Sequence, residues 1–322
     1  MNKPIQPTVP EIGTSAPSEN VNSGKLVVRG MVLMSFAMLI LPMMDGIAKV
    51  LSTQYDVTPG QITFGRFLVQ AVLLGSVLAL FYGRGRMVPK HWAINILRGA
   101  IMGCAVLMFF TALRYMPIAD AIAVFFVEPF ILTIMSVVFL KETVGWRRTA
   151  AVIMGFIGAL FIIQPSYDLF GPVSLLPIGT AFLFATYLLI TRLFAGDDDP
   201  VAMQFMAGIG GVLALSTIMI AGNFFGIADI SAPDIPEFGV RWALIFAIGA
   251  LAAGGHLMVV WAFRWASASL LAPFQYIEIV GATLIGFWLF GDFPDALKWV
   301  GIAIIVGSGL YLIFRERSVQ SS

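Results

Sequence analysis

Long apolar runs, separated by short polar segments, occupy almost the whole chain after its first residues. Four of these runs carry no charged residue over about 20 positions: Thr149–Tyr167, Leu169–Thr191, Pro200–Ala228 and Trp242–Phe263. A helix needs about 20 residues to cross about 30 Å of hydrocarbon, and the runs do not alternate as barrel strands would. The pattern therefore predicts an all-α polytopic membrane protein with ten transmembrane helices. We place these near residues 30–51, 62–82, 93–114, 118–140, 147–165, 173–194, 201–222, 242–263, 268–290 and 296–314.

The two ends of the chain differ from its middle. Residues 1–24 are rich in Pro, Ser, Asn and Thr without an apolar stretch, which predicts a disordered N-terminal tail, and residues 315–322 form a short C-terminal tail. Thirteen lysines and arginines fall on the tail side of the predicted spans and four on the opposite side. The positive-inside rule therefore predicts a multi-pass protein of the cell inner membrane with both termini in the cytoplasm.

The composition and the missing motifs argue against several classes of protein function. Of the 322 residues, 59% are hydrophobic and 11% charged, and the net charge is +1, so nothing favours a nucleic-acid partner. A single cysteine, Cys104, cannot form an internal disulfide. The sequence has neither an HExxH motif nor a P-loop, so we expect no catalytic metal, no cofactor and no ATPase activity.

The two halves of the chain resemble one another. A shift of 150 residues brings Glu128 onto Glu278 and segment 112–115 onto 262–265, and a shift of 143 brings Lys49 onto Arg192. This predicts a first repeat over 30–165 and a second over 173–314, with five spans each. Because five is odd, the second repeat would be inverted, an architecture of secondary transporters that bind solute near the bilayer midplane.

Several short motifs resemble those of the EamA-repeat family of the drug/metabolite transporter superfamily. They are ALRYMPIADA (112–121), LKE (140–142), GFIG (155–158), APFQY (272–276) and FGDFP (290–294). The segments DGIAK (45–49) and LRG (97–99) resemble a sub-branch with S-adenosylmethionine and riboflavin carriers. The resemblance implies this fold and solute transport but not one substrate. Asp292, where the second repeat usually has Glu, and Glu128, often uncharged in relatives, depart from the family pattern.

Charged groups within the predicted spans are the candidate site residues. A charge at mid-bilayer costs about 2.5–3.5 kcal/mol, so each needs a function or a partner. Glu128 and Glu278 are repeat mates about 15 Å into their spans, which favours contact with a cationic or donor-rich solute, or proton exchange, over structural ion pairs. Gln275 and Tyr276 lie beside Glu278 and would line the same cavity, although the tyrosine hydroxyl would equally serve a helix contact.

Asp45 and Lys49 share one face of the first span, four residues apart. Pro42 lies three residues earlier, so two interpretations stay open. Either the helix opens locally and presents free carbonyls to a solute, or it kinks and Asp45 pairs with Lys49 or with Arg66. We include all three charged residues among the substrate-binding candidates.

Other polar residues in or near the spans are expected to have structural roles. Arg98 is expected to extend to the membrane interface, and His256 to be a structural donor. The acidic run 197–199 is expected to be a solvated loop, and the methionines and phenylalanines to fill the core or face lipid. Two small-residue faces, Gly99-x3-Gly103 and Ala250-x3-Gly254, predict close helix contacts.

Together these features predict a transporter, not an enzyme, that moves a small organic metabolite by alternating access. The mixed charges suit an amino acid, S-adenosylmethionine or riboflavin. Spans one to four and six to nine would line the cavity, while the fifth and tenth would be peripheral and support a homodimer within the membrane lipid. A membrane-embedded enzyme acting on a lipid or isoprenoid is the alternative, and a receptor or scaffold is a third candidate.

Overall fold

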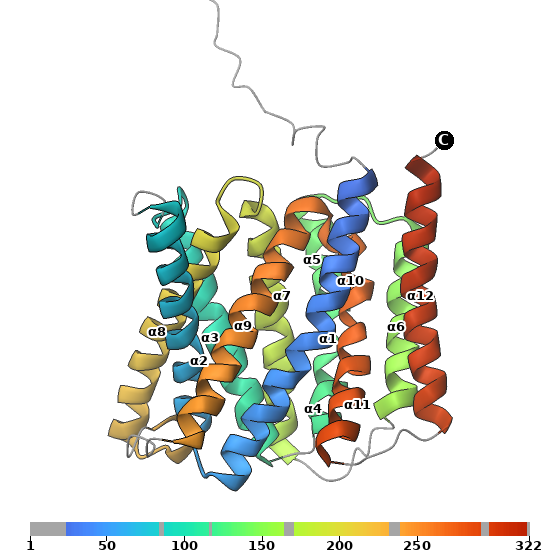
Figure 1. Ribbon diagram of the computed structural model, residues 1–322. Coiled ribbons are helices and arrows are strands. Elements are labelled where there is room, and N and C mark those ends of the chain that lie inside the picture. The colour runs from blue at the N-terminus through green and yellow to red at the C-terminus, as the bar shows by residue number, and fades with distance from the viewer. Residues whose placement is uncertain are drawn as a thin grey trace, which may run out of the picture.

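All regular structure in the described part of the chain is helical. The computed structural model describes residues 24–83, 87–115, 118–163, 171–231, 239–290 and 296–320 (Figure 1). In chain order the α-helices are α1 (Gly24–Gln54), α2 (Pro59–Val77), α3 (Trp92–Tyr115), α4 (Ile118–Phe125), α5 (Glu128–Leu140), α6 (Trp146–Ile163), α7 (Leu175–Phe194), α8 (Pro200–Phe225), α9 (Val240–Trp265), α10 (Ala268–Gln275), α11 (Ile277–Phe290) and α12 (Ala296–Gln320). Short π or 3-10 turns cover Leu78–Tyr82, Gly171–Ser174 and Ala228–Ile230.

Most of these helices have the length and composition of membrane spans. Seven helices qualify by both criteria: α1, α2 with its π-helical extension, α3, α7, α8, α9 and the segment of α10 and α11. Parts of α5, α6 and α12 are apolar but shorter. Large apolar side chains such as Phe81 (79% exposed) and Phe224 (83%) lie on the outside, which is the arrangement that lipid requires. The prediction of an all-helical, multi-pass membrane protein is confirmed.

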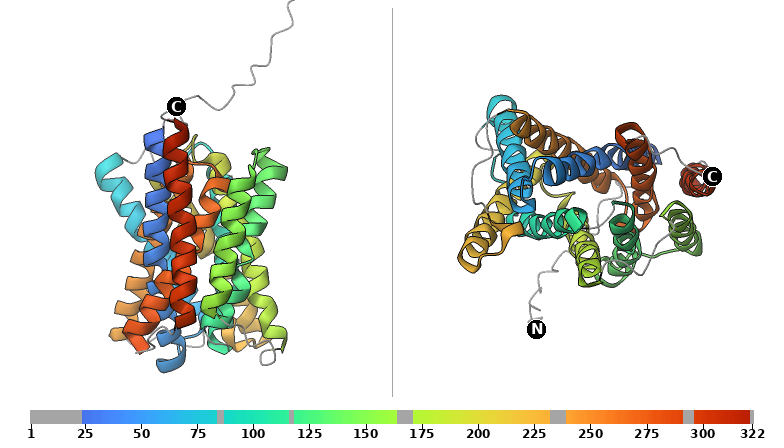
Figure 2. Two further views of the ribbon diagram at one scale, coloured as in Figure 1. Left: turned by 90° about the vertical axis from the view of Figure 1, so that its right-hand side faces the viewer. Right: turned by 90° about the horizontal axis from the view of Figure 1, so that it is seen from below.

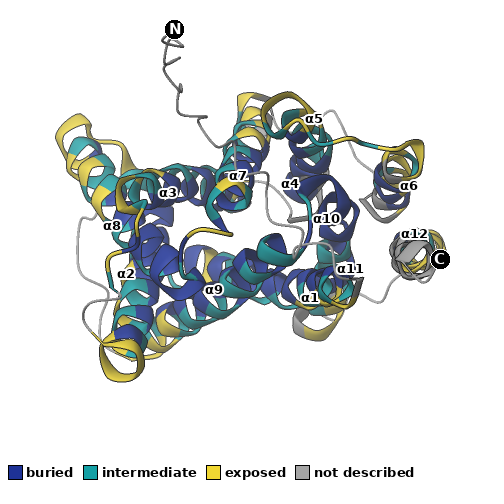
Figure 3. Cartoon of the chain, turned by 90° about the horizontal axis from the view of Figure 1, so that it is seen from above, coloured by how far each residue is buried: buried dark blue, intermediate teal, exposed yellow. Residues whose placement is uncertain are grey.

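The helices form one closely packed group and a peripheral pair. In the group, α1 packs on α9 and α11, α3 on α7 and α8, α2 on α8 and α9, and α5 on α7 and α10. The pair α6 and α12 lies side by side at one edge (Figure 2). Buried residues face the middle of the bundle, and exposed residues lie on its outer surface and at its ends (Figure 3). The beginning of α1 and the end of α12 lie at the same end of the bundle (Figure 1).

The predicted fourth and ninth spans are each divided into two helices. The break between α4 and α5 falls at Phe126 and Val127, and the break between α10 and α11 falls at Tyr276. Pro129 occupies the first turn of α5, where a missing N–H is tolerated. Of the two interpretations of Pro42, the local opening is absent, because α1 stays helical through that residue. The discontinuities therefore lie next to Glu128 and Glu278 and not next to Asp45.

One of the two predicted small-residue contacts is present. Gly99 and Gly103 both face α8, and a Cβ at Gly99 would overlap the backbone of Ala207. The second prediction is wrong: no neighbouring atom lies within 4 Å of the position that a Cβ would occupy at Gly254, and the adjacent Gly255 makes the close contact with α1. A small residue permits close approach only where the partner helix faces it.

The acidic run before α8 is not simply a solvated loop, which corrects that prediction. Asp199 caps α8 by accepting from the N–H groups of the second and third helical residues. Asp198 is 4% exposed and accepts hydrogen bonds from the Asn95 side chain (3.0 Å) and the His91 backbone N–H (3.3 Å). Asp197 alone of the three is exposed. The run thus fixes the beginning of α8 against α3.

Candidate functional site

A pocket lies in the middle of the bundle, between helices of both halves of the chain. It holds about 480 Å³ of empty space, including space open to solvent. Six helices contribute to its wall: α1, α3, α4, α7, α9 and α11. The lining residues are Leu41, Met44, Asp45, Met102, Ala105, Val106, Phe109, Phe110, Phe125, Thr180, Phe184, His256 and Glu278.

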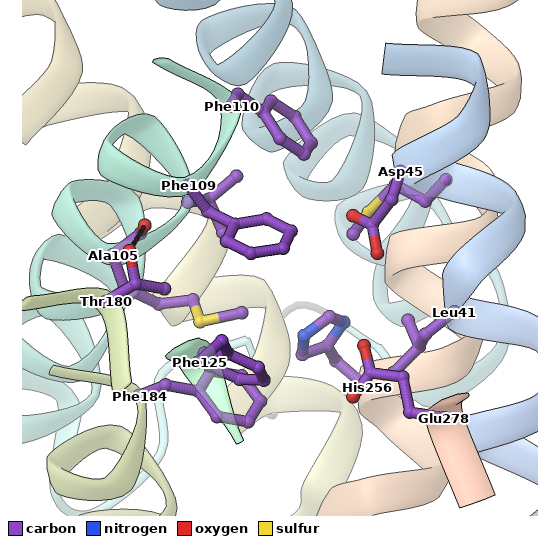
Figure 4. A pocket seen from close by; sticks show the side chains of 13 residues that line it. Leu41, Asp45, Ala105, Phe109, Phe110, Phe125, Thr180, Phe184, His256 and Glu278 are labelled. Atoms are coloured by element: carbon purple, nitrogen blue, oxygen red, sulfur yellow. Dashed lines mark hydrogen bonds between the residues drawn. The ribbon is translucent and has the colours of Figure 1, made fainter. Parts of the chain in front are cut away.

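Two carboxylates and one imidazole supply most of the polar groups of the pocket. Asp45, 5% exposed, reaches in from α1, and the half-buried Glu278 reaches in from α11. Figure 4 shows His256 between them. The carboxylates of Asp45 and Glu278 are close enough to interact electrostatically. A pocket with two acidic groups on one side favours a solute that carries positive charge.

Phenylalanines form the opposite wall. The ring centroids of Phe109 and Phe125 are 5.6 Å apart, as are those of Phe125 and Phe184 (Figure 4). Their quadrupoles can attract a cation, and their faces can stack on a planar ring. These three phenylalanines belong to the buried core, as expected for most phenylalanines of the chain, and they also line the pocket, which the sequence did not indicate. Nothing in the sequence distinguishes them from the other phenylalanines, because only the packing of α3, α4 and α7 brings them together.

His256 has a structural contact and also faces the pocket, which the sequence did not indicate. Its Nδ1 lies 3.0 Å from the Ala252 carbonyl, the distance of a hydrogen bond that the ring can donate. Behind it lies Arg66, fully buried, with Nη2 3.5 Å from both ring nitrogens. The Arg66 guanidinium also interacts electrostatically with Asp45, while its Nε and Nη1 make no hydrogen bond with the described residues. Arg66 therefore contacts His256 from outside the pocket and does not line the pocket itself.

Arg98 does not extend to the membrane interface, contrary to the prediction. It is 0% exposed. Its guanidinium donates to Thr191 Oγ1 (2.9 Å), to the Met203 carbonyl (2.9 Å) and to Gln204 Oε1 (3.0 Å). The guanidinium carbon Cζ of Arg98 also lies 5.1 Å from the centroid of the Tyr187 ring. Arg98 therefore joins α3 to α7 and α8 inside the bundle.

The remaining candidates lie outside the pocket lining. Lys49 is half-buried on α1, about one turn beyond Asp45. Glu128, Gln275 and Tyr276 are almost fully buried and lie close together where α5 meets α10. Of the seven substrate-binding candidates, the structure therefore brings only Asp45 and Glu278 into the pocket.

A polar link joins the two halves of the chain at one end of the bundle. Lys141 (φ 54°) ends α5 in the left-handed conformation, and Glu142 follows it. The Glu142 carboxylate accepts from the N–H groups of Ala268 (3.2 Å) and Ser269 (3.0 Å) at the beginning of α10. Arg192 Nε, at the end of α7, lies 3.6 Å from the same carboxylate. Glu142 thus satisfies free donors of α10 and places an acid at the positive end of its dipole.

Comparison with known proteins identifies the family. The sequence profile of the EamA-like transporter family matches residues 28–164 and 172–315. The chain belongs to the EamA-like transporter family. It is a multi-pass membrane protein that transports small metabolites, and the family and the relatives found are transporters rather than enzymes.

The similar curated proteins carry different solutes. An S-adenosylmethionine uptake transporter of Rickettsia bellii (strain RML369-C) is 26% identical over 81% of this chain and 86% of its own length. A riboflavin transporter of Vibrio cholerae is 27% identical over 88% and 93% of the two chains. The pseudopaline exporter CntI of Pseudomonas aeruginosa is 26% identical over 87% and 94%. A solved crystal structure with 18% identity superposes with a TM-score of 0.73 over 89% of this chain and 98% of its own, which shows the fold alone.

Proposed function

We propose that this transporter carries a positively charged, ring-bearing metabolite by alternating access between two inverted five-helix repeats. The observation that carries the proposal is the central pocket, in which Asp45 and Glu278 lie opposite a wall of phenylalanines. The carboxylates would bind the cationic group and the rings would hold the planar part.

Internal contacts between repeat mates support the inverted repeats. A two-fold axis brings residues near it against their own counterparts. Phe126 and Tyr276, mates under the shift of 150, have ring centroids 5.6 Å apart. The corresponding helices α2 and α8 pack on each other, as do α6 and α12. The two stretches that match the family, 28–164 and 172–315, also agree with the proposed repeats 30–165 and 173–314.

The charges of the pocket favour one solute among those of the relatives. S-adenosylmethionine carries a sulfonium, an ammonium group and an adenine ring, whereas riboflavin has a ring system without a cation. Two carboxylates beside an aromatic wall suit the first better. We therefore take S-adenosylmethionine as the first solute to test, with riboflavin and amino acids as competitors.

The proposed orientation places both ends of the chain in the cytoplasm of a bacterial inner membrane. The beginning of α1 and the end of α12 lie at one end of the bundle (Figure 1), and most of the lysines and arginines outside the spans belong to this side by sequence. Bacterial relatives that transport metabolites support the same membrane.

Uptake into proteoliposomes tests the solute. With labelled S-adenosylmethionine we expect saturable uptake that excess unlabelled solute inhibits. Asp45→Asn and Glu278→Gln should each weaken apparent affinity about 10- to 100-fold, the loss of one charge-assisted hydrogen bond. Asp197→Asn is the matched control, because Asp197 is exposed and does not line the pocket. Unchanged affinity in both pocket variants would refute the proposed site.

The homodimer stays a prediction, and the paired helices α6 and α12 are its proposed contact surface. They contribute no residue to the pocket among the described residues, and both expose apolar side chains, such as Ile153 and Val300. Native mass spectrometry from lipid nanodiscs would detect the dimer, and a monomer alone would exclude it.

A further inference from the structure

Glu128 is a buried carboxyl group with no cation beside it among the described residues. Its side chain is 0% exposed, neither carboxylate oxygen has a hydrogen-bond partner of standard geometry there, and the neutral side-chain amide of Gln275 is the donor that comes near it. The Nε2 of Gln275 and the hydroxyl of Tyr276, both in the same neighbourhood, also lack a partner in the described part of the chain. Buried polar atoms are nearly always paired, so unpaired ones gathered at one place require an explanation.

This group is separate from the solute pocket. Glu278 lines the pocket whereas its repeat mate Glu128 does not, although the two interact electrostatically. Tyr276 packs beside Glu128, against the ring of Phe126 and against Gly155 of α6, where a Cβ would overlap the tyrosine ring. The two mates therefore occupy different environments.

The groups around Glu128 do not stabilise the ionised form of its own carboxyl group. On α10 its neighbours are Gln275 and Tyr276, and on α11 the interacting group is the acidic Glu278, which in turn interacts with Asp45. From α7, which also packs on α5, no charged group of the described residues interacts with it. An ionised carboxylate with so few donors in a low-dielectric interior is costly. Glu142 is the contrast, since it accepts two backbone N–H groups and faces Arg192.

We propose that Glu128, with Gln275 and Tyr276, forms a proton-binding site distinct from the solute pocket, and that its proton drives transport. This rests on the proposed function of the chain as a solute carrier and assigns different roles to the mates: Glu278 contacts solute and Glu128 carries the proton. A metal cation would need more oxygen ligands than these side chains offer.

The proton step is simple. A proton from water on one side of the membrane forms an O–H bond with a carboxylate oxygen of Glu128, which is then neutral and tolerated in the buried state. In the opposite-facing state the same bond breaks and the proton leaves to water on the other side. Glu128 begins α5 directly after the break at Phe126 and Val127, a place where a rearrangement of helix segments can expose it.

Infrared difference spectroscopy tests the proton site without any solute. At neutral pH the purified protein should show the carbonyl stretch of a protonated carboxylic acid, and Glu128→Gln should remove the part of this band that belongs to Glu128, whatever the other carboxyl groups of the bundle, Asp45 and Glu278, contribute to it. Glu142→Gln is the matched control and should leave this band in place, because Glu142 lies outside the Glu128 group and already accepts two backbone N–H hydrogen bonds. An unchanged band in Glu128→Gln would overturn the proposal, and so would a wild-type spectrum that shows ionised Glu128.

Transport measurements test the coupling. In proteoliposomes, a pH gradient should drive accumulation of S-adenosylmethionine by the wild type, whereas Glu128→Gln should exchange labelled for unlabelled solute and lose the gradient-driven part. Gradient-driven accumulation that survives in Glu128→Gln, or a requirement for Na⁺ in place of a pH gradient, would refute the coupling. If no solute is transported at all, the proposed function fails, while the infrared result still decides the protonation of Glu128.

Discussion

Replacing Arg98 with methionine removes a buried cation while keeping a side chain of similar length. The guanidinium makes three hydrogen bonds to α7 and α8. Interhelical hydrogen bonds in membrane proteins contribute about 0.6 kcal/mol on average and about 1.7 at most, so the three together give about 2–5 kcal/mol. Part of this loss of stability is offset, because the variant no longer buries a charge. We therefore expect the free energy of unfolding to fall by about 2 kcal/mol in total.

Thermal unfolding of the purified protein in detergent measures this loss. A destabilisation of about 2 kcal/mol corresponds to a Tm lower by about 3 °C for a chain of 322 residues. Arg98→Lys should give an intermediate value, since an ammonium group cannot reproduce the fork of a guanidinium. Arg147→Met is the matched control: Arg147 is exposed at the beginning of α6, and its loss should change stability by less than about 0.5 kcal/mol. If Arg98→Met and Arg147→Met unfold at the same temperature, Arg98 does not join these helices and the reasoning is wrong.

Two further pairs of substitutions test contacts between the halves of the chain. Gly99→Ala should destabilise the protein by about 1–3 kcal/mol, because the new Cβ overlaps the backbone of Ala207, whereas Gly254→Ala, with open space around it, should be neutral or stabilising in the same melting assay. Equal effects would contradict the proposed close packing. Glu142→Gln should lower stability by about 1–2 kcal/mol through the weakened cap of α10, and combining it with Arg192→Gln should cost less than the sum of the two single changes, since the two residues share one contact, although Arg192 also donates to the Phe263 carbonyl (2.7 Å). Additive melting shifts would show that they act independently.

The helices were largely predictable because the membrane imposes their length. The apolar runs located the segments that became α1 to α3 and α6 to α9, and the charge-free runs required no knowledge of packing. The breaks at Phe126 and Tyr276 were harder. Pro129 and Pro273 lie near them, but Pro42 lies within an uninterrupted α1, so a proline alone does not predict where a span divides.

The charged candidates show where sequence reasoning fails. Depth in the membrane can be counted along a helix, and it drew attention to Asp45 and Glu278, which both line the pocket. The direction in which a side chain points depends on its neighbours. Arg98 was expected at the interface because a long side chain can reach it, yet Thr191 and Gln204 lie within hydrogen-bond distance inside the bundle. No pattern in one sequence reveals such partners on distant helices.

The proposed repeats account for the position of the pocket, and differences between mates account for its chemistry. Leu41 and Phe184 correspond under the shift of 143, and Val106 and His256 under the shift of 150, and all four line the pocket. A cavity on a pseudo-two-fold axis must be lined by mates, so the fold determines its position. The polar groups of the pocket come from pairs of corresponding residues in which one residue is polar and the other is not. Asp45, for example, corresponds to a leucine, Leu188, which does not line the pocket. We infer that solute specificity changes by substitution at one mate of a pair, which leaves the helix packing intact and allows one fold to serve relatives with different solutes.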